Sequence, residues 1–381
     1  MYISVALHKP KKKLHNRIEQ LLSLADVAIN GSRPWDIQVH DDNLYCAIMK
    51  NGSLGLGESY MSGWWDAERV DEFICRVLKA NLQKKVNSMQ DVICYLQAAV
   101  MNQQSPDRSY EVGEKHYDIG NYLYEHMLDS RMTYSCGFWR HAKTLDEAQE
   151  AKLDLVCRKL ELRPGMRVLG IGCGWGGMAQ YAAEKYDAEV VGITISREQA
   201  SLARQRCKGL PVDIRLQDYR SLDETFDRIL SIGMFEHVGY KNYRTYMRKV
   251  RSLLKDDGLF LLHTIGSNTS QKTTDSWIHK YIFPNSMLPS AKQISSAFEG
   301  IFVLEDWHGF GADYDTTLMH WYENFRGSWN RLKKGYDERF YRMWNYYLLS
   351  CAGSFRARYN QLWQIVLSPE GVSGGYRSLL R

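Results

Sequence analysis

The chain has 381 residues, of which 44% are apolar, enough for a substantial core and for two domains or one large domain with an appended piece. No apolar run approaches the ~18–20 residues that span a bilayer. Eight cysteines without CxxC pairs or histidines at metal spacing indicate neither a disulfide framework nor a zinc site. We therefore expect a cytoplasmic protein with free thiols.

A basic cluster lies near the start of the chain. The net charge is +5, and Lys9, Lys11, Lys12, Lys13 and Arg17 stand close together. Such a run is most often a solvated face, but it is also compatible with docking on an anionic membrane surface. We expect no nucleic-acid partner.

Residues 1–100 are predicted to form a mainly helical N-terminal domain. Apolar residues over 70–78 recur at the i, i+3, i+4, i+7 and i+8 positions of a helix. The glycine-rich segment 53–65 is predicted to be a flexible loop whose aromatic end, Trp64 and Trp65, inserts at a membrane interface. The alternative is a tight turn with both tryptophans in a core.

A polar, proline-containing segment over 101–110 is predicted to link this domain to a second one over 111–381. In the second domain, Thr144 and Glu147 form a capping box that predicts a helix to about Leu160. Because strand patterns then alternate with helical ones, we predict an α/β fold with a mostly parallel sheet and with ligands beyond the carboxyl ends of its strands. The predicted strands lie near 166–172, 189–195, 212–216, 226–233 and 258–265.

Residues 270–350 are rich in tryptophan, tyrosine and phenylalanine but lack an obvious further sheet. One interpretation is a second packed layer of helices. The other is an apolar tunnel for a long-chain substrate.

The stretch 168–177 is the most informative. A buried strand runs into a turn in which Gly172, Gly174 and Gly177 fit G-x-G-x-x-G, a pattern that brings backbone close to a nucleotide-like cofactor. By itself this pattern is weak. A nicotinamide site needs an acid at the end of the second strand, whereas the segment 194–199 offers hydroxyls and an amide there. S-adenosylmethionine is therefore favoured.

Polar residues after the fourth predicted strand are candidates for substrate chemistry. Glu236 and His237 stand there. A lone Glu-His pair is usually structural, but this one gains weight from polar groups flanked by glycine or aromatic residues around Cys136, in 263–267 and in 311–315. The loop-like surroundings of Cys136 suit an active-site lid better than a core thiol.

Ten segments together are far more specific than the glycine loop. They are GLGESYMSGWW (55–65), GEKHYDIGN (113–121), YSC (134–136), GCGWGG (172–177), VGITIS (191–196), QDYR (217–220), GMFEHVG (233–239), LLHTIGS (261–267), KYIFPN (280–285) and GADYDTTLMHWYENF (311–325). On these segments the chain resembles the bacterial cyclopropane-fatty-acyl-phospholipid synthase family over nearly its whole length.

The resemblance implies a class I methyltransferase, Rossmann-like fold with a helical lipid-binding insertion and a smaller N-terminal domain. It implies transfer of the S-adenosylmethionine methyl group to a cis double bond of a phospholipid acyl chain, giving a cyclopropane. The substrate would be the phospholipid bilayer, the location the inner membrane face as a peripheral protein, and the assembly a homodimer.

The resemblance also implies the site residues. Bicarbonate would be bound by Cys136, Glu236, His237, the Ile265 backbone and Tyr314. A small fixed anion there can stabilise the carbocation and accept the proton lost on ring closure, while an apolar site keeps out water. Cys351 is a weak candidate for a covalent role and a better candidate for a small core residue.

The implied cofactor contacts place the Gln199 carboxamide near the ribose and Asp218 near the adenine. The predicted cofactor-binding residues are Tyr134, Ser135, Gly170, Gly172, Cys173, Gly174, Trp175, Gly176, Thr194, Ile195, Ser196, Gln199, Asp218 and Tyr219.

One position departs from the family pattern. The family ends its first strand with an acid, and this chain has Gly170, which predicts weaker cofactor binding. Two other functions stay open: an amine N-methyltransferase on the same fold, and a non-catalytic lipid-binding protein. The segments 55–65 and 310–317 favour the lipid enzyme.

Overall fold

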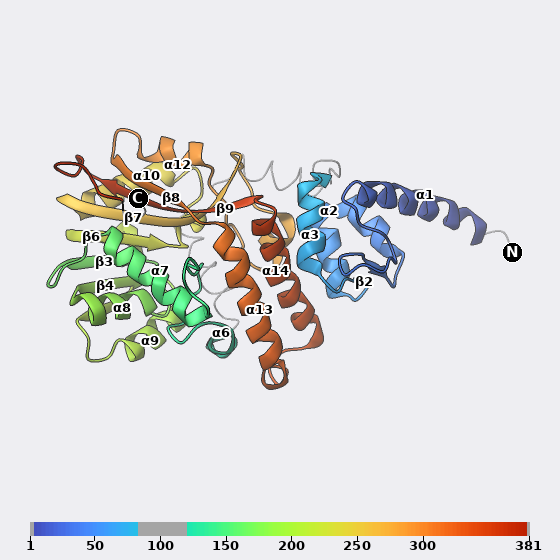
Figure 1. Ribbon diagram of the computed structural model, residues 1–381, viewed down its shortest axis with the longest axis horizontal. Coiled ribbons are helices and arrows are strands. Elements are labelled where there is room, and N and C mark those ends of the chain that lie inside the picture. The colour runs from blue at the N-terminus through green and yellow to red at the C-terminus, as the bar shows by residue number, and fades with distance from the viewer. Residues whose placement is uncertain (1–3, 83–119, 379–381) are drawn as a thin grey trace.

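The computed structural model describes residues 4–82 and 120–378. The linker predicted at 101–110 lies outside the described residues, so the predicted domain boundaries stay a prediction. Figure 1 shows an elongated molecule, with the N-terminal helices at one end, an α/β body at the other and the long helices α13 (Ala312–Leu332) and α14 (Glu338–Arg356) between them.

The N-terminal helical unit, residues 4–82, consists of three main helices and one small two-stranded sheet. Their bounds are α1 (Ser4–Ser23), α2 (Asn43–Met61), α3 (Val70–Lys79), β1 (Gln38–Val39) and β2 (Trp65–Asp66). Helix α3 confirms the predicted apolar periodicity, because Val70, Phe73 and Ile74 are buried.

Segment 53–65 is helical rather than a flexible loop, so that prediction is wrong. Helix α2 runs through it to Met61, with a kink at Gly52 where φ is 57°. Added Cβ atoms at Gly55 and Gly57 would collide with the Ala47 carbonyl and with the Trp277 ring. These glycines therefore allow close helix packing instead of mobility.

The two tryptophans that follow α2 do not form an inserting pair. Trp65 is 0% exposed, and its Nε1 donates a hydrogen bond to the Leu56 carbonyl at 3.1 Å. Trp64 is half-buried. The interpretation of Trp65 as a membrane anchor is wrong, and the alternative of a core residue is confirmed for it.

The α/β body is built on a seven-stranded sheet in the order β5-β4-β3-β6-β7-β9-β8. The pairs from β5 to β7 are parallel, and β9 pairs antiparallel with both β7 and β8. The strands are β3 (Arg167–Ile171), β4 (Glu189–Thr194), β5 (Val212–Leu216), β6 (Phe226–Ile232), β7 (Leu254–Ser267), β8 (Val303–Gly309) and β9 (Asn360–Ser368). The five predicted strands and the mostly parallel sheet are confirmed.

Region 270–350 forms no sheet of its own, but it contributes one strand that the sequence did not predict, β8, to the seven-stranded sheet. This strand occupies an edge of the sheet and its residues are half-buried or exposed. An edge strand with Glu305 and Asp306 at its centre lacks the apolar alternation that marks a strand in the sequence.

Helices cover both faces of the sheet. One face packs against α7, α8 and α9, and the other packs against α10 and α12. The bounds are α7 (Leu145–Lys159), α8 (Gly177–Tyr186), α9 (Arg197–Arg206), α10 (Tyr243–Leu253) and α12 (Ala291–Phe298), with the short helices α6 (Asn121–Met127), α11 (Ser276–Tyr281), η2 (Tyr219–Ser221) and η3 (Phe235–His237). The predicted capping box of α7 is present, since Thr144 and Glu147 hydrogen-bond reciprocally.

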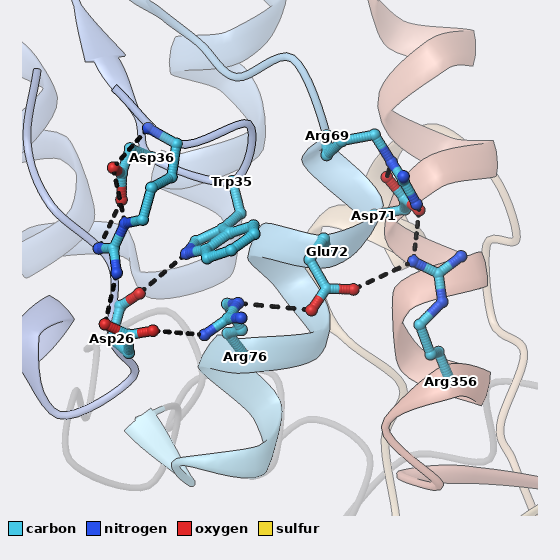
Figure 2. A network of polar contacts seen from close by, with 9 residues as sticks. Asp26, Trp35, Asp36, Arg69, Asp71, Glu72, Arg76 and Arg356 are labelled. Carbon is cyan, nitrogen blue, oxygen red and sulfur yellow. Dashed lines mark hydrogen bonds and ion pairs between the residues drawn. The ribbon is translucent and has the colours of Figure 1, made fainter. Parts of the chain in front are cut away.

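Charged side chains join the N-terminal helical unit to the body, as Figure 2 shows. Arg356, the last residue of α14, contacts Asp71 and Glu72 on α3. Arg69 holds the other side of Asp71, with hydrogen bonds of 2.9 and 2.7 Å. Apolar residues of α3 and α14 belong to the same core cluster, so the two parts share one packed interior.

Candidate active site

A cavity of about 220 Å³ opens at the carboxyl ends of the parallel strands. Residues that follow β3, β4, β5 and β6 line it, which is where the sequence predicted a ligand. All the predicted cofactor residues except Gly176 line this cavity. We call it the cofactor cavity.

The glycines of the β3–α8 turn hold the backbone in conformations that other residues avoid. Gly172 and Gly174 have φ of 79° and 55°, and a Cβ at Gly172 would meet the Met234 side chain at 3.0 Å. Gly176 has φ of 85°, but an added Cβ there would meet Cys207 and Ala203. The structure therefore assigns Gly176 to helix packing, away from the cavity.

The turn after β4 supplies hydroxyl and amide groups. The Thr194 hydroxyl donates to the Gln199 carboxamide oxygen at 2.9 Å, and the Ser196 hydroxyl caps α9 by accepting from the Gln199 amide N–H. With its oxygen occupied, the Gln199 side chain offers its NH₂ group as a donor. These contacts orient the residues that line the cavity at this strand end.

Asp218 supplies a fixed negative charge after β5. Burial raises the pKa of its carboxyl, but hydrogen bonds from Arg220 outweigh that effect and lower the pKa overall. Arg220 makes an ion pair of 2.5 Å with Asp218 and also lines the cavity. Asp218 is therefore an ionised acceptor, and Arg220 is a site residue that the sequence did not single out.

A second cavity of about 550 Å³ lies between the body and the N-terminal helical unit. Its walls are largely apolar, and we call it the acyl cavity. From the N-terminal side it is lined among others by Ile18, Leu22, Ile48, Leu56, Phe73 and Leu78. From region 270–350, Trp277 and Phe283 line the cavity, while Trp321 and Phe325 are buried and do not, so this aromatic region contributes to the packed core and to the cavity wall.

The two cavities meet. Tyr134, Ser135, Gly233 and His237 line both of them. The Tyr134 hydroxyl lies 2.8 Å from the Tyr347 hydroxyl, which links the 134–136 segment to α14. A group held in one cavity can therefore react with a group held in the other at this junction.

Glu236 and His237 lie at the junction, on η3 directly after β6. One Glu236 oxygen accepts the Ile265 amide N–H at 2.6 Å. Within residues 4–82 and 120–378, the other Glu236 oxygen and His237 Nδ1 have no hydrogen-bond partner. Both residues line the acyl cavity, so their unused polar atoms are available to a small polar ligand.

Burial shifts the pKa values of both side chains. Desolvation raises the pKa of Glu236 to about 7 and lowers the pKa of His237 to about 4. At neutral pH His237 is therefore uncharged, and Glu236 can gain or lose a proton. Proton-transfer groups work best when their pKa lies near the working pH.

The remaining predicted ion ligands are not all brought together. Ile265 and Tyr314 line the acyl cavity with Glu236 and His237. The Cys136 thiol lines neither cavity; it donates to the Gly137 carbonyl at 3.1 Å and lies 3.8 Å from the Thr317 hydroxyl. Four of the five predicted residues therefore line one cavity, although the Ile265 amide N–H is already bound to Glu236.

Cys351 lines the acyl cavity, but its thiol is not activated. Burial raises its pKa to about 12, so the thiolate is scarce at neutral pH. A covalent role is unsupported by this environment.

Two buried residues near the junction were missed as site residues. His263 on β7 is 1% exposed, lines the acyl cavity and, among the described residues, leaves Nε2 without a partner. Lys152 on α7 is 0% exposed and lines the cofactor cavity. His263 stood in a polar segment noted from the sequence, whereas a lysine inside a predicted helix carries no signal of burial.

Within the described residues, no helix combines the length and apolar character needed to cross a bilayer. Over the same residues, no set of three or more histidine, cysteine, aspartate or glutamate side chains is placed to hold a metal ion.

The fold and the cofactor cavity define a class I S-adenosylmethionine-dependent methyltransferase. A sequence model of the family described as mycolic acid cyclopropane synthetase matches residues 104–365. The chain belongs to this cyclopropane synthase family.

Two curated relatives illustrate the similarity. The chain is 53% identical over 369 residues to the cyclopropane-fatty-acyl-phospholipid synthase of Escherichia coli strain K12, covering 97% of this chain and 96% of that protein. It is 35% identical over 289 residues to cyclopropane mycolic acid synthase 2 of Mycobacterium leprae, covering 68% of this chain and 93% of that protein.

Solved structures give the same picture. The cyclopropane synthase MmaA2 of Mycobacterium tuberculosis matches with a TM-score of 0.64 and 32% identity, over 68% of this chain and 97% of its own. CmaA1, complexed with S-adenosylhomocysteine and CTAB, matches with the same values. Coclaurine N-methyltransferase has a TM-score of 0.65 over 82% of this chain and 98% of its own, but at 23% identity it shows a shared fold alone.

Proposed function

We propose that this protein transfers a methylene group from S-adenosylmethionine to the cis double bond of an unsaturated phospholipid acyl chain, forming a cyclopropane ring. The observation that carries the proposal is the junction of a cofactor cavity with a larger apolar cavity at Tyr134, Ser135, Gly233 and His237. The Escherichia coli relative, similar over nearly the whole chain, carries this activity in its name.

The residues of the cofactor cavity fit S-adenosylmethionine. A Cβ at Gly172 would crowd the turn that the cofactor must approach, the ionised Asp218 can accept from an adenine or hydroxyl donor, and the Gln199 amide can donate. When bound, S-adenosylmethionine supplies an electrophilic methyl group. The chain's own residues then orient that group toward the acyl cavity.

The acyl cavity suits an apolar chain and the cationic character that develops on it. Its apolar walls exclude water that would otherwise quench a carbocation. The rings of Phe283 and Tyr314 line it, with Phe283 5.9 Å from the His237 ring, and aromatic rings can stabilise positive charge. The N-terminal helices complete these walls, which supports an acyl substrate that reaches across both parts of the chain.

We also propose that bicarbonate is held at the junction. The unused Glu236 oxygen, His237 Nδ1 and the Tyr314 side chain face the same cavity and fit a small oxyanion that both donates and accepts hydrogen bonds. Bicarbonate would supply a base for the proton released on ring closure. Glu236, whose pKa is raised to about 7, can then take that proton onward. The Cys136 thiol lines neither cavity, so this proposal assigns it no direct contact with the ion.

We propose peripheral docking on an anionic membrane at the free end of α1. Lys13 and Arg17 are exposed, while Ile18, Leu21 and Leu22 of the same helix line the acyl cavity. Figure 1 shows α1 extending from the body toward the chain's start. The basic end of the helix can meet headgroups while its apolar end borders the acyl cavity. The inner membrane face as location and a homodimer as assembly stay predictions.

The test uses purified protein with vesicles of a cis-unsaturated phospholipid, S-adenosylmethionine and added bicarbonate. Mass spectrometry should find acyl chains heavier by one methylene group and lacking the double bond. The Glu236→Gln protein serves as the matched inactive control. Methylation of an aromatic amine in place of the lipid would support the amine enzyme, and cofactor binding without product would support the non-catalytic alternative; either result would overturn the proposal.

A further inference from the structure

A buried lysine lies in the wall of the cofactor cavity. Lys152, in the middle of α7, is 0% exposed and lines the cavity with its neighbour Leu153. Its Nζ donates to the Ser135 hydroxyl at 2.7 Å. An ammonium has three donors, and this is its one hydrogen bond within the described residues. No carboxylate among those residues lies within ion-pair distance of it.

A second buried lysine on the same helix, Lys159, has the counterion that Lys152 lacks among the described residues. Lys159 is also 0% exposed, and its Nζ lies 3.0 Å from the Asp306 carboxylate. Removing an ammonium from water costs several kcal/mol unless an opposite charge compensates it. The fold gives Lys159 a counterion and leaves Lys152 facing the cofactor cavity without one.

Strand β3, which packs beneath α7, has a glycine at position 170, where a side chain could otherwise supply a counterion. Gly170 on β3 pairs with Leu230 on β6, and Leu230 packs in the core layer that contains Leu153 of α7. A side chain at position 170 would therefore point toward that layer. An added Cβ there would meet nothing closer than 3.8 Å. Gly170 and Lys152 both line the cavity, so position 170 supplies no carboxylate to the cavity that Lys152 lines.

The charged and titratable groups around Lys152 are few. Burial lowers its pKa to about 8, while Asp129 and Cys136 act in the opposite direction. Asp129 is already bound by the Thr133 amide at 2.7 Å and the Arg131 amide at 3.0 Å. Burial lowers the pKa of the nearby His263 well below its ordinary value and the positive charge of Lys152 lowers it further, so His263 stays neutral. Lys152 is thus an ammonium at neutral pH whose neighbours do not neutralise it.

We infer that Lys152, together with the Ser135 hydroxyl that it holds, binds the α-carboxylate of the cofactor's amino-acid end. The inference rests on the proposed use of S-adenosylmethionine. That carboxylate is the one anionic group in both S-adenosylmethionine and S-adenosylhomocysteine, so it is the group that a buried cation in this cavity selects. The subsite is rigid, because Gln149 donates to the Ser135 carbonyl at 2.7 Å. Lys152 is a cofactor-binding residue in this assignment.

Isothermal titration separates this role from a structural one. Two ligands are compared: S-adenosylhomocysteine, and 5′-methylthioadenosine, which keeps the nucleoside and sulfur but lacks the amino-acid end. Lys152→Met should weaken binding of S-adenosylhomocysteine by about tenfold or more, since a charge-assisted hydrogen bond is lost. Binding of methylthioadenosine should stay within about twofold of wild type. An equal loss for both ligands, or no loss for either, would overturn the inference.

The matched control is Lys159→Met, which removes an equally buried lysine of the same helix outside the cavity and should leave both affinities unchanged. Should Lys152→Met fail to fold, wild-type protein still provides the test. Its affinity for S-adenosylhomocysteine should fall as pH rises above 8, and its affinity for methylthioadenosine should not; a parallel pH response of both ligands would contradict the assignment. If wild-type protein binds neither ligand, the proposed cofactor itself is wrong, which is a distinct outcome.

Discussion

The guanidinium of Arg356 contacts the carboxylate of Asp71, although 285 residues separate them in the chain. Asp71 is 1% exposed and sits in the first turn of α3, while Arg356 ends α14. Arg356 also binds Asp315 on α13 through two hydrogen bonds of 2.9 Å. One side chain therefore joins α3 of the N-terminal helical unit to both long helices of the body.

Replacing Arg356 with methionine should loosen that junction. Among the described residues Asp71 would keep Arg69 as its remaining ion-pair partner, and Asp315 would lose both of its hydrogen bonds to Arg356. We therefore expect a loss of about 1–3 kcal/mol in the free energy of unfolding. Chemical denaturation measures it. Arg356→Lys, which keeps the charge but not the forked geometry, should recover part of the loss. Wild-type stability in the methionine protein would show that the contact contributes nothing.

Replacing Glu236 with glutamine should abolish most turnover and leave cofactor affinity nearly intact, because Glu236 lies at the junction and outside the cofactor cavity lining. In wild type, kcat/KM should fall as pH drops below about 7, the raised pKa of Glu236. His237→Ala and Tyr314→Phe should also lower turnover. Retention of wild-type turnover in the glutamine protein would contradict the proposed ion site.

The same substitution, Glu236→Gln, should also change how the stability of the protein depends on pH. The folded protein holds the Glu236 proton more tightly than the unfolded chain, whose pKa lies near the ordinary value of 4.5. Deprotonation therefore costs the folded state stability as pH rises from about 4.5 to about 7. Glu236→Gln should remove this part of the pH dependence, which thermal denaturation at several pH values measures.

Replacing Cys136 with serine should have a mild effect on turnover. The thiol lines neither cavity and contacts the Gly137 carbonyl and Thr317, which a serine hydroxyl can also reach. Loss of packing around a fully buried thiol should lower stability by about 1 kcal/mol. A loss of turnover as large as that of Glu236→Gln would instead make the thiol part of the ion site.

Replacing Gly170 with aspartate should tighten S-adenosylmethionine binding by about ten- to a hundredfold, or 1.5–3 kcal/mol. The site has room for the side chain, since a Cβ added at Gly170 would meet nothing closer than 3.8 Å, and position 170 lines the cofactor cavity. The gain should be larger for S-adenosylmethionine than for S-adenosylhomocysteine, because only the former carries a sulfonium. Gly170→Asn is the uncharged control. Unchanged or weaker binding in the aspartate protein would show that Gly170 causes no deficiency.

Replacing Lys9, Lys11, Lys12, Lys13 and Arg17 with glutamine should release the protein from anionic vesicles. Each basic residue near such a surface contributes about 1 kcal/mol, and salt should produce the same release. Co-sedimentation measures binding, with neutral vesicles as a comparison. Trp64→Ala is the control and should bind as wild type does. Unaltered binding of the glutamine variant would place the membrane contact elsewhere on the molecule.

The sequence predicted the parts of the fold whose local pattern and tertiary setting agree. Strands β3, β4 and β6 and the later part of β7 are largely buried and apolar, and the α7 capping box is a local contact, so these elements were predicted correctly. Strand β8 was missed because it is an edge strand with charged residues. Segment 53–65 was misjudged because glycines allow mobility in isolation but close packing here, and the contacts with Ala47 and Trp277 distinguish the two.

The residues of the candidate site were likewise predicted in part. The cofactor-binding residues were predicted from their positions at strand ends and from the family resemblance, and all but Gly176 line the cavity. The direction of a side chain is set by distant partners, however. The Cys136 thiol contacts the Gly137 carbonyl and Thr317, which is 181 positions away, and Lys152 donates to Ser135 in the cavity wall. No local sequence pattern within α7 distinguishes the buried Lys152 from an exposed lysine.

The acyl cavity has walls from both parts of the chain, and this makes substrate occupancy and the association of those parts linked equilibria. A lipid chain that touches Ile18 and Phe73 on one side and Leu318 and Phe355 on the other binds only while the two parts are together. By mass action it must hold them together. Removing bound lipid should therefore favour separation of the N-terminal helices before the sheet unfolds, and the measured cooperativity of unfolding would report how much lipid a preparation retains.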